Sequence, residues 1–442
     1  MIDHFSRTTN PVKRTARRCL AAMATLAVAA TALTGTASAA PSGPPEPAHE
    51  RRLMKVPHQA LNASRSEPAL SRAPVTGRKT CSPTPAGSKA RAAGAVKVCV
   101  ETTPTPAGSR AQTTAAAAGC DVAAGHYGHN RHMYCLNDLR RTYTLLGTDG
   151  AVKGVGEISL NTHATLGAHS ASWNETITAT VTRLDEHVNS LTIALEASCD
   201  NACAMINKNP WSNTTTLSAV GQSVSGTVTY RVALAAGERS MVTPKAVLKL
   251  YQAGDVPGDF DHGLSLPWPA RCDAEFSTVG CVFPQTRPAV QMSLAAYGAA
   301  TVTYWYARDY LSDHWGAPDS PLQRLASDSA ATRNRRLTCE DLSSIPFVPF
   351  ADIPEDSCDE YPFAHTYQGG TDGGRCAEII PKFEDGEWWI YVIIGREPTG
   401  YEPCVRGHVP LTQNKAAGGK YGNFVQNERV LDLEKFTVTI TQ

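Results

Sequence analysis

Two neighbouring carboxylates, Asp359 and Glu360, stand near the C-terminus between a cysteine and a proline. Pro362 restricts Tyr361 to extended backbone conformations, and a disulfide at Cys358 would hold the other side, so the pair is rigidly presented. Carboxylates held in this way can take a proton or bind a divalent cation. Adjacent residues of a regular strand point to opposite faces, so at most one is expected to face a site directly unless the chain bends. Composition alone favours a simpler interpretation, surface acids in a turn.

A second segment with polar side chains suited to a cation or a phosphate follows further along the chain. Asn414 is expected near the start of a helix, where its amide could cap the helix or complete a metal site. Gly418, Gly419 and Gly422 weaken the helix prediction, because each costs about 1 kcal/mol relative to alanine. The same glycines could instead let a phosphate or a backbone approach closely.

Together, the two segments resemble the NucA/NucB deoxyribonuclease family. The resemblance rests on Cys-Asp-Glu-Tyr-Pro-Phe-Ala at residues 358–364, Gln-Gly-Gly at 368–370, Gln-Asn at 413–414 and Ala-Gly at 417–418, and it covers about residues 335–442. It implies a metal-dependent, sequence-nonspecific endonuclease with a small ββα-metal core, in which an acid replaces the usual histidine base. Segments at 271–273, 280–282 and 321–325 resemble longer secreted actinobacterial members that carry a β-rich domain before the nuclease.

The resemblance also implies roles for the polar residues. Cleaving a phosphodiester needs a positioned water, a base and a cation that stabilises charge on the phosphate and leaving oxygen. By motif, Asp359 and Glu360 would supply the base and a metal-site carboxylate, and Asn414 would be the direct Mg²⁺ or Mn²⁺ ligand. Asp359 is slightly favoured as the base. A cation held by one or two protein ligands plus waters and phosphate oxygens is one that magnesium commonly accepts.

Further residues are candidates for substrate contact. His365 stands where the family usually has a small hydroxyl residue, and it could be a second catalytic base, a phosphate donor or a solvent-facing loop histidine. Gln413 is expected to position Asn414 or a phosphate, and Lys415 to contact DNA. A basic run at residues 333–336 ends in Arg336, which is predicted to touch phosphate, although such runs are more often solvated surface.

Two other clusters favour structural interpretations. His126, His129 and His132 lie between Cys120 and Cys135, but their spacing differs from zinc patterns with two histidines four residues apart on a helix. Hydrogen-bonded or solvated loop histidines are therefore favoured over a zinc site. The tryptophans at residues 388–389 lie within an apolar strand and are expected in a core, with base stacking as the lesser alternative.

The N-terminus predicts export. Residues 1–40 have basic residues, then an alanine-rich apolar run, then Ala-Ser-Ala at 37–39, which is typical of a signal peptide. The general secretory route is favoured over the twin-arginine route, because the residues flanking the arginines at 17–18 match the latter poorly. No later apolar run reaches the roughly 18 residues of a membrane span. We therefore expect a secreted, extracellular protein.

Twelve cysteines remain once Cys19 leaves with the signal peptide, as expected for disulfides in an oxidising compartment. Sequence cannot fix their connectivity, but their spacing suggests short loops closed in chain order. That order would pair residues 81 with 99, 120 with 135, 199 with 203, 272 with 281, 339 with 358 and 376 with 404. Zinc ligation by these cysteines is disfavoured, because paired C-x2-C knuckles are missing from the sequence.

Composition divides the mature chain into three parts. Residues 41–117 are predicted to be a disordered, Ala/Pro-rich basic linker, with eleven Lys or Arg against four acids over residues 41–110. Residues 118–318 are predicted to form an all-β sandwich, since residues 176–181, 191–195, 226–232 and 300–305 alternate apolar and polar side chains. Residues 319–442 are predicted to form a small α+β nuclease domain, which is acidic, with ten basic residues against seventeen acids over residues 335–442.

The sequence therefore predicts a secreted nuclease that hydrolyses extracellular DNA with Mg²⁺ or Mn²⁺. The basic linker could attract phosphate that the acidic domain repels, or it could bind the cell wall or cell surface. The alternative is a noncatalytic adhesion or polyanion-binding protein with an inactive nuclease-like domain. A toxin delivered to competitor cells is a third hypothesis, although no delivery domain is evident in the sequence.

Overall fold

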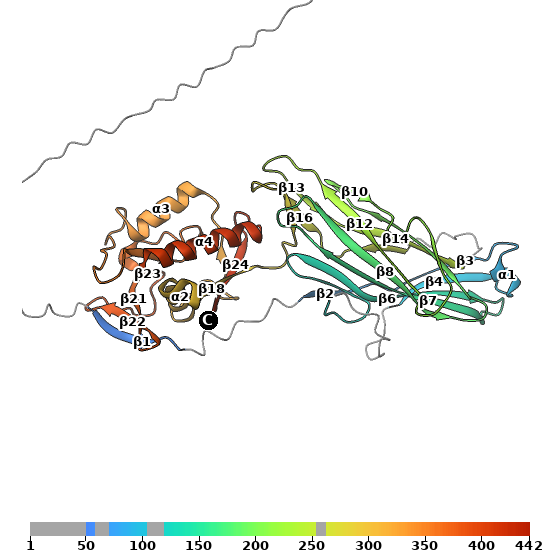
Figure 1. Cartoon of the computed structure of the whole chain (residues 1–442), viewed down its shortest axis with the longest axis horizontal. Helices are drawn as coiled ribbons and strands as arrows, with labels where there is room; N and C mark the ends of the chain where they lie inside the picture. Colours follow the sequence, from blue (N-terminus) through green and yellow to red (C-terminus); the bar gives the residue numbers. More distant parts are fainter. Residues whose placement is uncertain (1–49, 58–69, 104–118, 253–261) are drawn as a thin grey trace, which may run out of the picture. The chain divides into compact units, whose positions relative to one another are not determined.

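The computed structural model describes residues 50–57, 70–103, 119–252 and 262–442 (Figure 1). The predicted signal peptide and much of the predicted linker lie outside these residues. The described part is mostly β-sheet with few helices, and its hydrophobic residues form two large cores. No helix in the described ranges is long and apolar enough to cross a membrane.

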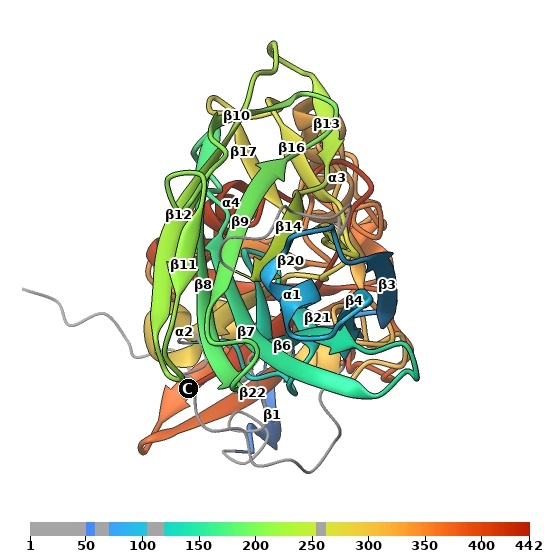
Figure 2. The same ribbon diagram turned by 90° about the vertical axis from the view of Figure 1, so that its right-hand side faces the viewer.

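The first core lies in a β-rich domain with two main sheets (Figure 1, Figure 2). The larger sheet contains β2 (Ser71–Pro74), β3 (Arg78–Pro83), β4 (Lys97–Thr103), β5 (His126–His129), β6 (Met133–Leu146), β7 (Val152–Thr165), β8 (Ser172–Leu184), β10 (Cys203–Asn207) and β12 (Ser223–Val232). Its order is β10-β12-β8-β7-β6-β4-β3, with β5 paired to β6 and β2 to β5.

A smaller sheet covers the larger one. It has the order β11-β9-β14-β15, formed by Thr215–Leu217, Leu191–Ser198, Lys245–Gln252 and His262–Ser265. Side chains from both sheets, such as Ile177, Leu195 and Leu248, are buried in the same core, so the sheets pack face to face as a sandwich. A third sheet joins β13 (Arg239–Val242), β16 (Ala270–Asp273) and β17 (Gly280–Val282), and a short helix α1 spans Lys89–Ala92.

Part of the predicted linker is folded, contrary to expectation. β3 and β4 pair with each other, and a disulfide joins Cys81 of β3 to Cys99 of β4. β4 also pairs with β6, so both strands belong to the larger sheet of the sandwich. The physical reason is that apolar and polar side chains alternate in β4, so that Val98 and Val100 are buried in the sandwich core. The many alanines and prolines around this segment obscured the alternation. The remaining linker residues, 41–49, 58–69 and 104–117, lie outside the described part of the chain.

The second core belongs to the C-terminal domain. Its main sheet has the order β1-β22-β21-β23-β20, formed by Glu50–Lys55, Glu387–Ile393, Ala377–Glu384, Val405–Pro410 and Asp356–Tyr361. A second sheet places β24 (Lys435–Thr441) between β18 (Ala289–Ser293) and β19 (Leu322–Gln323). The helices are α2 (Leu294–Asp309), α3 (Asp328–Cys339), α4 (Leu411–Asn427) and a 3-10 turn at Gly373–Arg375.

Helix α2 corrects a strand prediction. Residues 300–305 alternate threonine with apolar side chains and were expected to be a strand of the sandwich, yet they form a helix in the C-terminal core. Every residue from 298 to 307 is buried, so the helix has no polar face along this stretch and its sequence lacks helical periodicity. β18 and α2 thus belong to the C-terminal core although they precede residue 319.

All six disulfides predicted from spacing are present. They join residues 81 to 99, 120 to 135, 199 to 203, 272 to 281, 339 to 358 and 376 to 404. The last two lie in the C-terminal domain, and Cys358 directly precedes Asp359. The predicted strands at residues 388–394 and 436–440 and the helix around Asn414 are also present, as β22, β24 and α4.

Candidate active site

Strand β20 carries the two neighbouring carboxylates along one edge of the main C-terminal sheet. It pairs with β23 on one side and is the last strand on the other. The Cys339–Cys358 disulfide joins β20 to the end of α3, with the two Cα atoms 5.9 Å apart. The strand is therefore fixed from two sides before any ligand is considered.

Asp359 is almost completely buried, with 4% of the residue exposed. Its Oδ1 accepts a hydrogen bond of 3.1 Å from the hydroxyl of Tyr304 on α2. Its Oδ2 is buried without a hydrogen-bond partner among the described residues. Burial raises the pKa of Asp359 well above its usual value, and repulsion from Glu360 adds to the rise while the bond from Tyr304 opposes it.

Glu360 turns toward α3, away from Tyr304. Its Oε1 lies 3.6 Å from Nε of Arg335, and its Oε2 lies 3.7 Å from Sγ of Cys339. Burial raises the pKa of Glu360, with the charge of Arg335 opposing the rise. The two acids thus contact different helices, as expected for strand neighbours. Both nevertheless border one cleft, because β20 is an edge strand.

Asn414 lies against the same strand. Helix α4 begins at Leu411, so Asn414 lies inside its first turn rather than at its cap. The amide Nδ2 of Asn414 donates to Ser357 Oγ and to the Cys358 carbonyl, both at 3.1 Å. These bonds fix the side chain beside Asp359 and leave Oδ1 as the atom suited to bind a cation.

A cleft of about 930 Å³ brings these groups together. Five of the seven candidate catalytic, metal-binding and substrate-binding residues line it: Asp359, Glu360, His365, Asn414 and Lys415. The volume is near the upper end for ligand-binding cavities.

His365 borders the cleft through a loop after β20. Its Nδ1 lies 3.2 Å from the carbonyl oxygen of Leu325, so Nδ1 carries the proton in this bond and Nε2 is left as an acceptor. Nε2 lies 4.0 Å from the exposed carboxylate of Asp328. Tyr421 of α4 donates to the carbonyl of His365 and holds the loop in place.

Two residues predicted to contact substrate lie outside the cleft wall. Gln413 Oε1 accepts a hydrogen bond of 2.7 Å from the Ala299 amide, beside a kink in α2 at Gly298, whose φ is 47°. The Gln413 side chain thus ties α4 to the helix that carries Tyr304. Arg336 forms two bonds with Asp341, of 2.8 and 2.6 Å.

The sequence reasoning missed other residues that line the cleft. They include Tyr304, Arg324 and Phe276. Arg335, which also lines the cleft, belongs to the basic run identified in the sequence, but such a run does not show which of its residues faces a site. The other three come from segments with no recognisable catalytic pattern, and Phe276 belongs to the turn between β16 and β17 of the β-rich domain.

The histidine cluster is structural, as favoured from its spacing. Nδ1 of His126 bonds to the Ala124 carbonyl, and His132 Nε2 lies 2.8 Å from a carboxylate oxygen of Glu428. His129 is buried against Trp268, with ring centroids 4.1 Å apart. Across the described ranges, no group of three or more His, Cys, Asp or Glu residues is arranged to hold a metal ion.

Comparison with known proteins identifies the segment that contains β20. Residues 314–387 match the family model of Deoxyribonuclease NucA/NucB, which confirms the resemblance for this segment. The match includes Asp359, Glu360 and His365 and ends before Asn414 and Lys415. No curated protein matches the chain.

A search of solved structures returned the native conformation of E. coli alpha-2-macroglobulin, determined by cryo-EM. It is 12% identical, with a TM-score of 0.18, over 32% of this chain and 9% of that chain. A similarity this low carries no argument about fold or function.

Proposed function

We propose that the C-terminal domain, which matches the NucA/NucB deoxyribonucleases over residues 314–387, hydrolyses phosphodiester bonds of extracellular DNA with Mg²⁺ or Mn²⁺ and without sequence preference. The observation that carries this proposal is the Oδ2 atom of Asp359, which is buried, unpartnered among the described residues and part of a residue that lines a large cleft. Leaving a buried polar atom unpartnered costs about 1–3 kcal/mol, so a ligand that satisfies it is favoured.

The polar groups around Asp359 fit a hard divalent cation. Mg²⁺ and Mn²⁺ prefer oxygen ligands, and Glu360 and Asn414 would offer oxygens from two elements. With so few protein ligands, the remaining positions would go to water and phosphate oxygens. Such a cation, when bound, stabilises negative charge on the phosphate and on the leaving oxygen.

The chain's own residues supply the proton transfer. Tyr304 holds Oδ1 of Asp359 and so leaves Oδ2 as the oxygen that accepts the proton of the attacking water. The pKa of Asp359, raised by burial, makes this carboxylate a stronger base than an exposed aspartate. His365, through Nε2, is the second candidate for this role.

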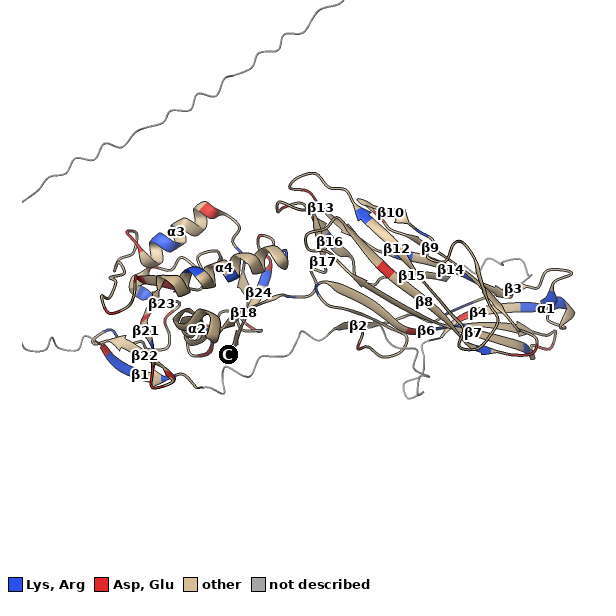
Figure 3. Cartoon of the chain, in the orientation of Figure 1, with Lys and Arg blue, Asp and Glu red and all other residues tan. Residues whose placement is uncertain are grey.

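Basic residues position the phosphate. Lys415, Arg335 and Arg324 line the same cleft as the carboxylates, and Figure 3 shows basic residues on α3 and α4. They offset part of the repulsion between DNA and an acidic domain. We also propose that β20, β23 and α4 correspond to the ββα-metal arrangement of the family, since α4 follows β23 directly and β20 pairs with β23.

Secretion is part of the proposal. Six disulfides and the lack of a membrane-spanning helix in the described residues are consistent with an extracellular protein. The signal peptide at residues 1–40 and binding of the basic linker to DNA or the cell wall stay predictions.

The test is cleavage of plasmid DNA by the purified mature protein with Mg²⁺ or Mn²⁺, with and without a chelator. We expect wild type to cut, the chelator to stop it, and Asp359→Ala, Glu360→Ala and Asn414→Ala each to lose at least about a hundredfold in rate. The matched control is Asp352→Ala, which removes a surface carboxylate outside the cleft.

The outcomes separate the candidate functions. Intact plasmid after incubation with a folded wild-type protein would refute the nuclease and favour the alternative, a noncatalytic adhesion or polyanion-binding protein. Cutting that persists in all three cleft variants would instead mean that the site is misassigned. Parallel digestion of RNA decides the preference between the two nucleic acids.

A further inference from the structure

One row of helix α4 faces the cleft. Asn414, Gly418, Gly422 and Gln426 are spaced four residues apart, which places them on one face of the helix, and all four line the cleft. The middle two members are glycines, so the cleft meets bare helix backbone there. The neighbouring Gly419 is exposed and lies outside the cleft wall.

The fold itself does not require these glycines. A Cβ atom built at Gly418, Gly419 or Gly422 would meet nothing within 4 Å, and none of the three has the positive φ that favours glycine. Glycine is nevertheless among the poorest helix formers. Glycine at positions 418 and 422 leaves the cleft wider by the volume of a side chain. The extra space benefits a ligand in the cleft, not the fold.

Further features of the same cleft point to a ligand that carries phosphates together with a cation. Asp359 is 4% exposed and lines the cleft, and its Oδ2 has no hydrogen-bond partner among the described residues, so a bound cation or hydrogen-bond donor would stabilise this atom. Lys415 lies near the start of the row, and Arg324 lines the cleft as well. Cations on the wall of a cleft are suited to successive phosphates of one strand.

The β-rich domain adds an aromatic ring to the same wall. The guanidinium of Arg324 lies 5.4 Å from the centroid of the Phe276 ring, and both residues line the cleft. Aromatic rings and guanidinium planes are the groups on which proteins stack unpaired bases.

We propose that the Gly418–Gly422 row is a binding path for a single strand of DNA, whose backbone lies on the bare helix and whose base stacks at Phe276 and Arg324. This inference rests on the proposed nuclease function and adds the path of its substrate. The β-rich domain is thereby a part of the substrate site, through Phe276.

The test compares Gly418→Ala and Gly422→Ala with the matched control Gly419→Ala in the full-length protein. All three should raise the urea midpoint of unfolding by similar amounts, because each adds the same helix-favouring methyl group in open space. The two cleft variants should raise KM for a single-stranded oligodeoxynucleotide at least fivefold, and leucine at the same positions more. Gly419→Ala should stay within twofold of wild type.

Binding without cleavage keeps this test separate from the proposed function. In an Asp359→Ala background with Mg²⁺, a short fluorescent oligodeoxynucleotide should bind at least fivefold more weakly when Gly418→Ala or Phe276→Ala is added. Phe383→Ala, which removes an exposed aromatic outside the cleft, should leave binding unchanged. The single strand should bind more tightly than a duplex of the same sequence.

Two results would overturn the strand path. One is a pair of cleft variants whose KM and affinity match those of Gly419→Ala, and the other is a duplex that binds as tightly as the single strand. If wild type fails to cut DNA while the oligodeoxynucleotide still distinguishes Gly418 from Gly419, the proposed chemistry falls and the binding path stands.

Discussion

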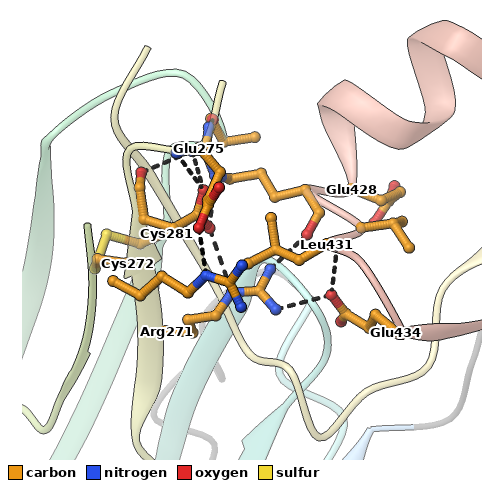
Figure 4. Close-up of polar contacts among 12 residues, drawn as sticks. Arg271, Cys272, Glu275, Cys281, Glu428, Leu431 and Glu434 are labelled. Carbon is orange, nitrogen blue, oxygen red and sulfur yellow. Dashed lines mark hydrogen bonds and ion pairs between the residues drawn. A yellow bond between two sulfur atoms is a disulfide. The ribbon is translucent and has the colours of Figure 1, made fainter. Parts of the chain in front are cut away.

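Removing the carboxylate of Asp273 should break the buried ion pair that joins the β-rich domain to the C-terminal domain and should destabilise the protein. Arg429, just after α4, donates Nε to Asp273 Oδ2 at 3.1 Å and Nη2 to the Asp273 carbonyl at 2.7 Å, with a further short contact to Oδ1. Arg429 Nη1 donates to the Ala168 carbonyl at 2.6 Å. Beside this pair, Arg271 Nη1 donates to Glu434 Oε2 at 2.8 Å, as Figure 4 shows.

The magnitude follows from burial. The side chains of Asp273 and Arg429 are both 0% exposed, so removing the Asp273 carboxylate leaves the Arg429 charge buried and without its ion-pair partner. Breaking a buried ion pair in this way costs about 3–5 kcal/mol. That is a large share of the roughly 5–15 kcal/mol that stabilises a folded domain. We therefore expect Asp273→Ala to lower the free energy of unfolding by about 3–5 kcal/mol.

The double variant Asp273→Ala with Arg429→Met tests the cause. Asp273→Ala alone should be severe, but adding Arg429→Met should cost little more, because the unpaired charge is then gone and the coupling energy of such neighbours reaches about 2–3 kcal/mol. Some cost remains, since the carbonyls of Ala168 and Thr278 lose the bonds from Arg429.

Urea unfolding followed by tryptophan fluorescence measures these effects, since both cores contain tryptophan. Wild type should unfold in one transition, and Asp273→Ala should separate the two domains into distinct transitions. The control is Arg239→Ala, which breaks a half-exposed pair with Glu275 and should cost less than about 1 kcal/mol. A loss below about 1 kcal/mol in Asp273→Ala, or strictly additive single and double variants, would refute the reasoning.

Three further perturbations have defined outcomes. Replacing Cys339 and Cys358 by serine opens a loop with a sequence separation of 19 and should cost about 3 kcal/mol in urea unfolding, with slower plasmid cutting because β20 loses its tie to α3. Burial lowers the pKa of His408, but the hydrogen bonds that its ring makes to the carboxylates of Asp356 and Glu378 outweigh burial and raise the pKa overall. The charged His408 ring therefore stabilises the fold fully below its unfolded pKa of about 6.5, and this stability is lost as pH rises through its folded pKa. His408→Gln has no such charge to lose, so its melting temperature should fall less above a pH of about 6.5 than that of wild type. Val56→Ala should cost up to about 1.5–3 kcal/mol and speed proteolysis of the C-terminal domain, because Val56 is 2% exposed in its core.

Local sequence patterns predicted the strands that bury one face and expose the other. Strands β8, β9 and β12 were found from period-two alternation, and short spacing predicted all six disulfides. Helix α2 was missed because it is buried on all sides, where helical and strand patterns converge. β1 was missed because its pairing partner, β22, lies more than 330 residues away in sequence, with Arg52 opposite Tyr391.

The family resemblance predicted that the site residues come together, but not the direction of every side chain. Asp359, Glu360 and Asn414 meet because β20 and the first turn of α4 are adjacent. Arg335 faces the cleft while Arg336 faces Asp341, since consecutive helical residues differ by about 100° in direction. No local pattern in the sequence gives that phase for a short basic run.

The two edges of the C-terminal sheet have different roles, and this constrains how the N-terminal segment can be processed. β20 forms one edge and carries the carboxylates of the cleft, whereas β1 covers the other by pairing with β22. Arg52 of β1 also lies 4.1 Å from the ring centroid of Trp389, a tryptophan that the sequence left as a lesser candidate for stacking bases. Cleavage after residue 57 would release a covering strand and leave β22 as an exposed, unpaired edge. The segment around β1 is therefore a structural part of the C-terminal domain.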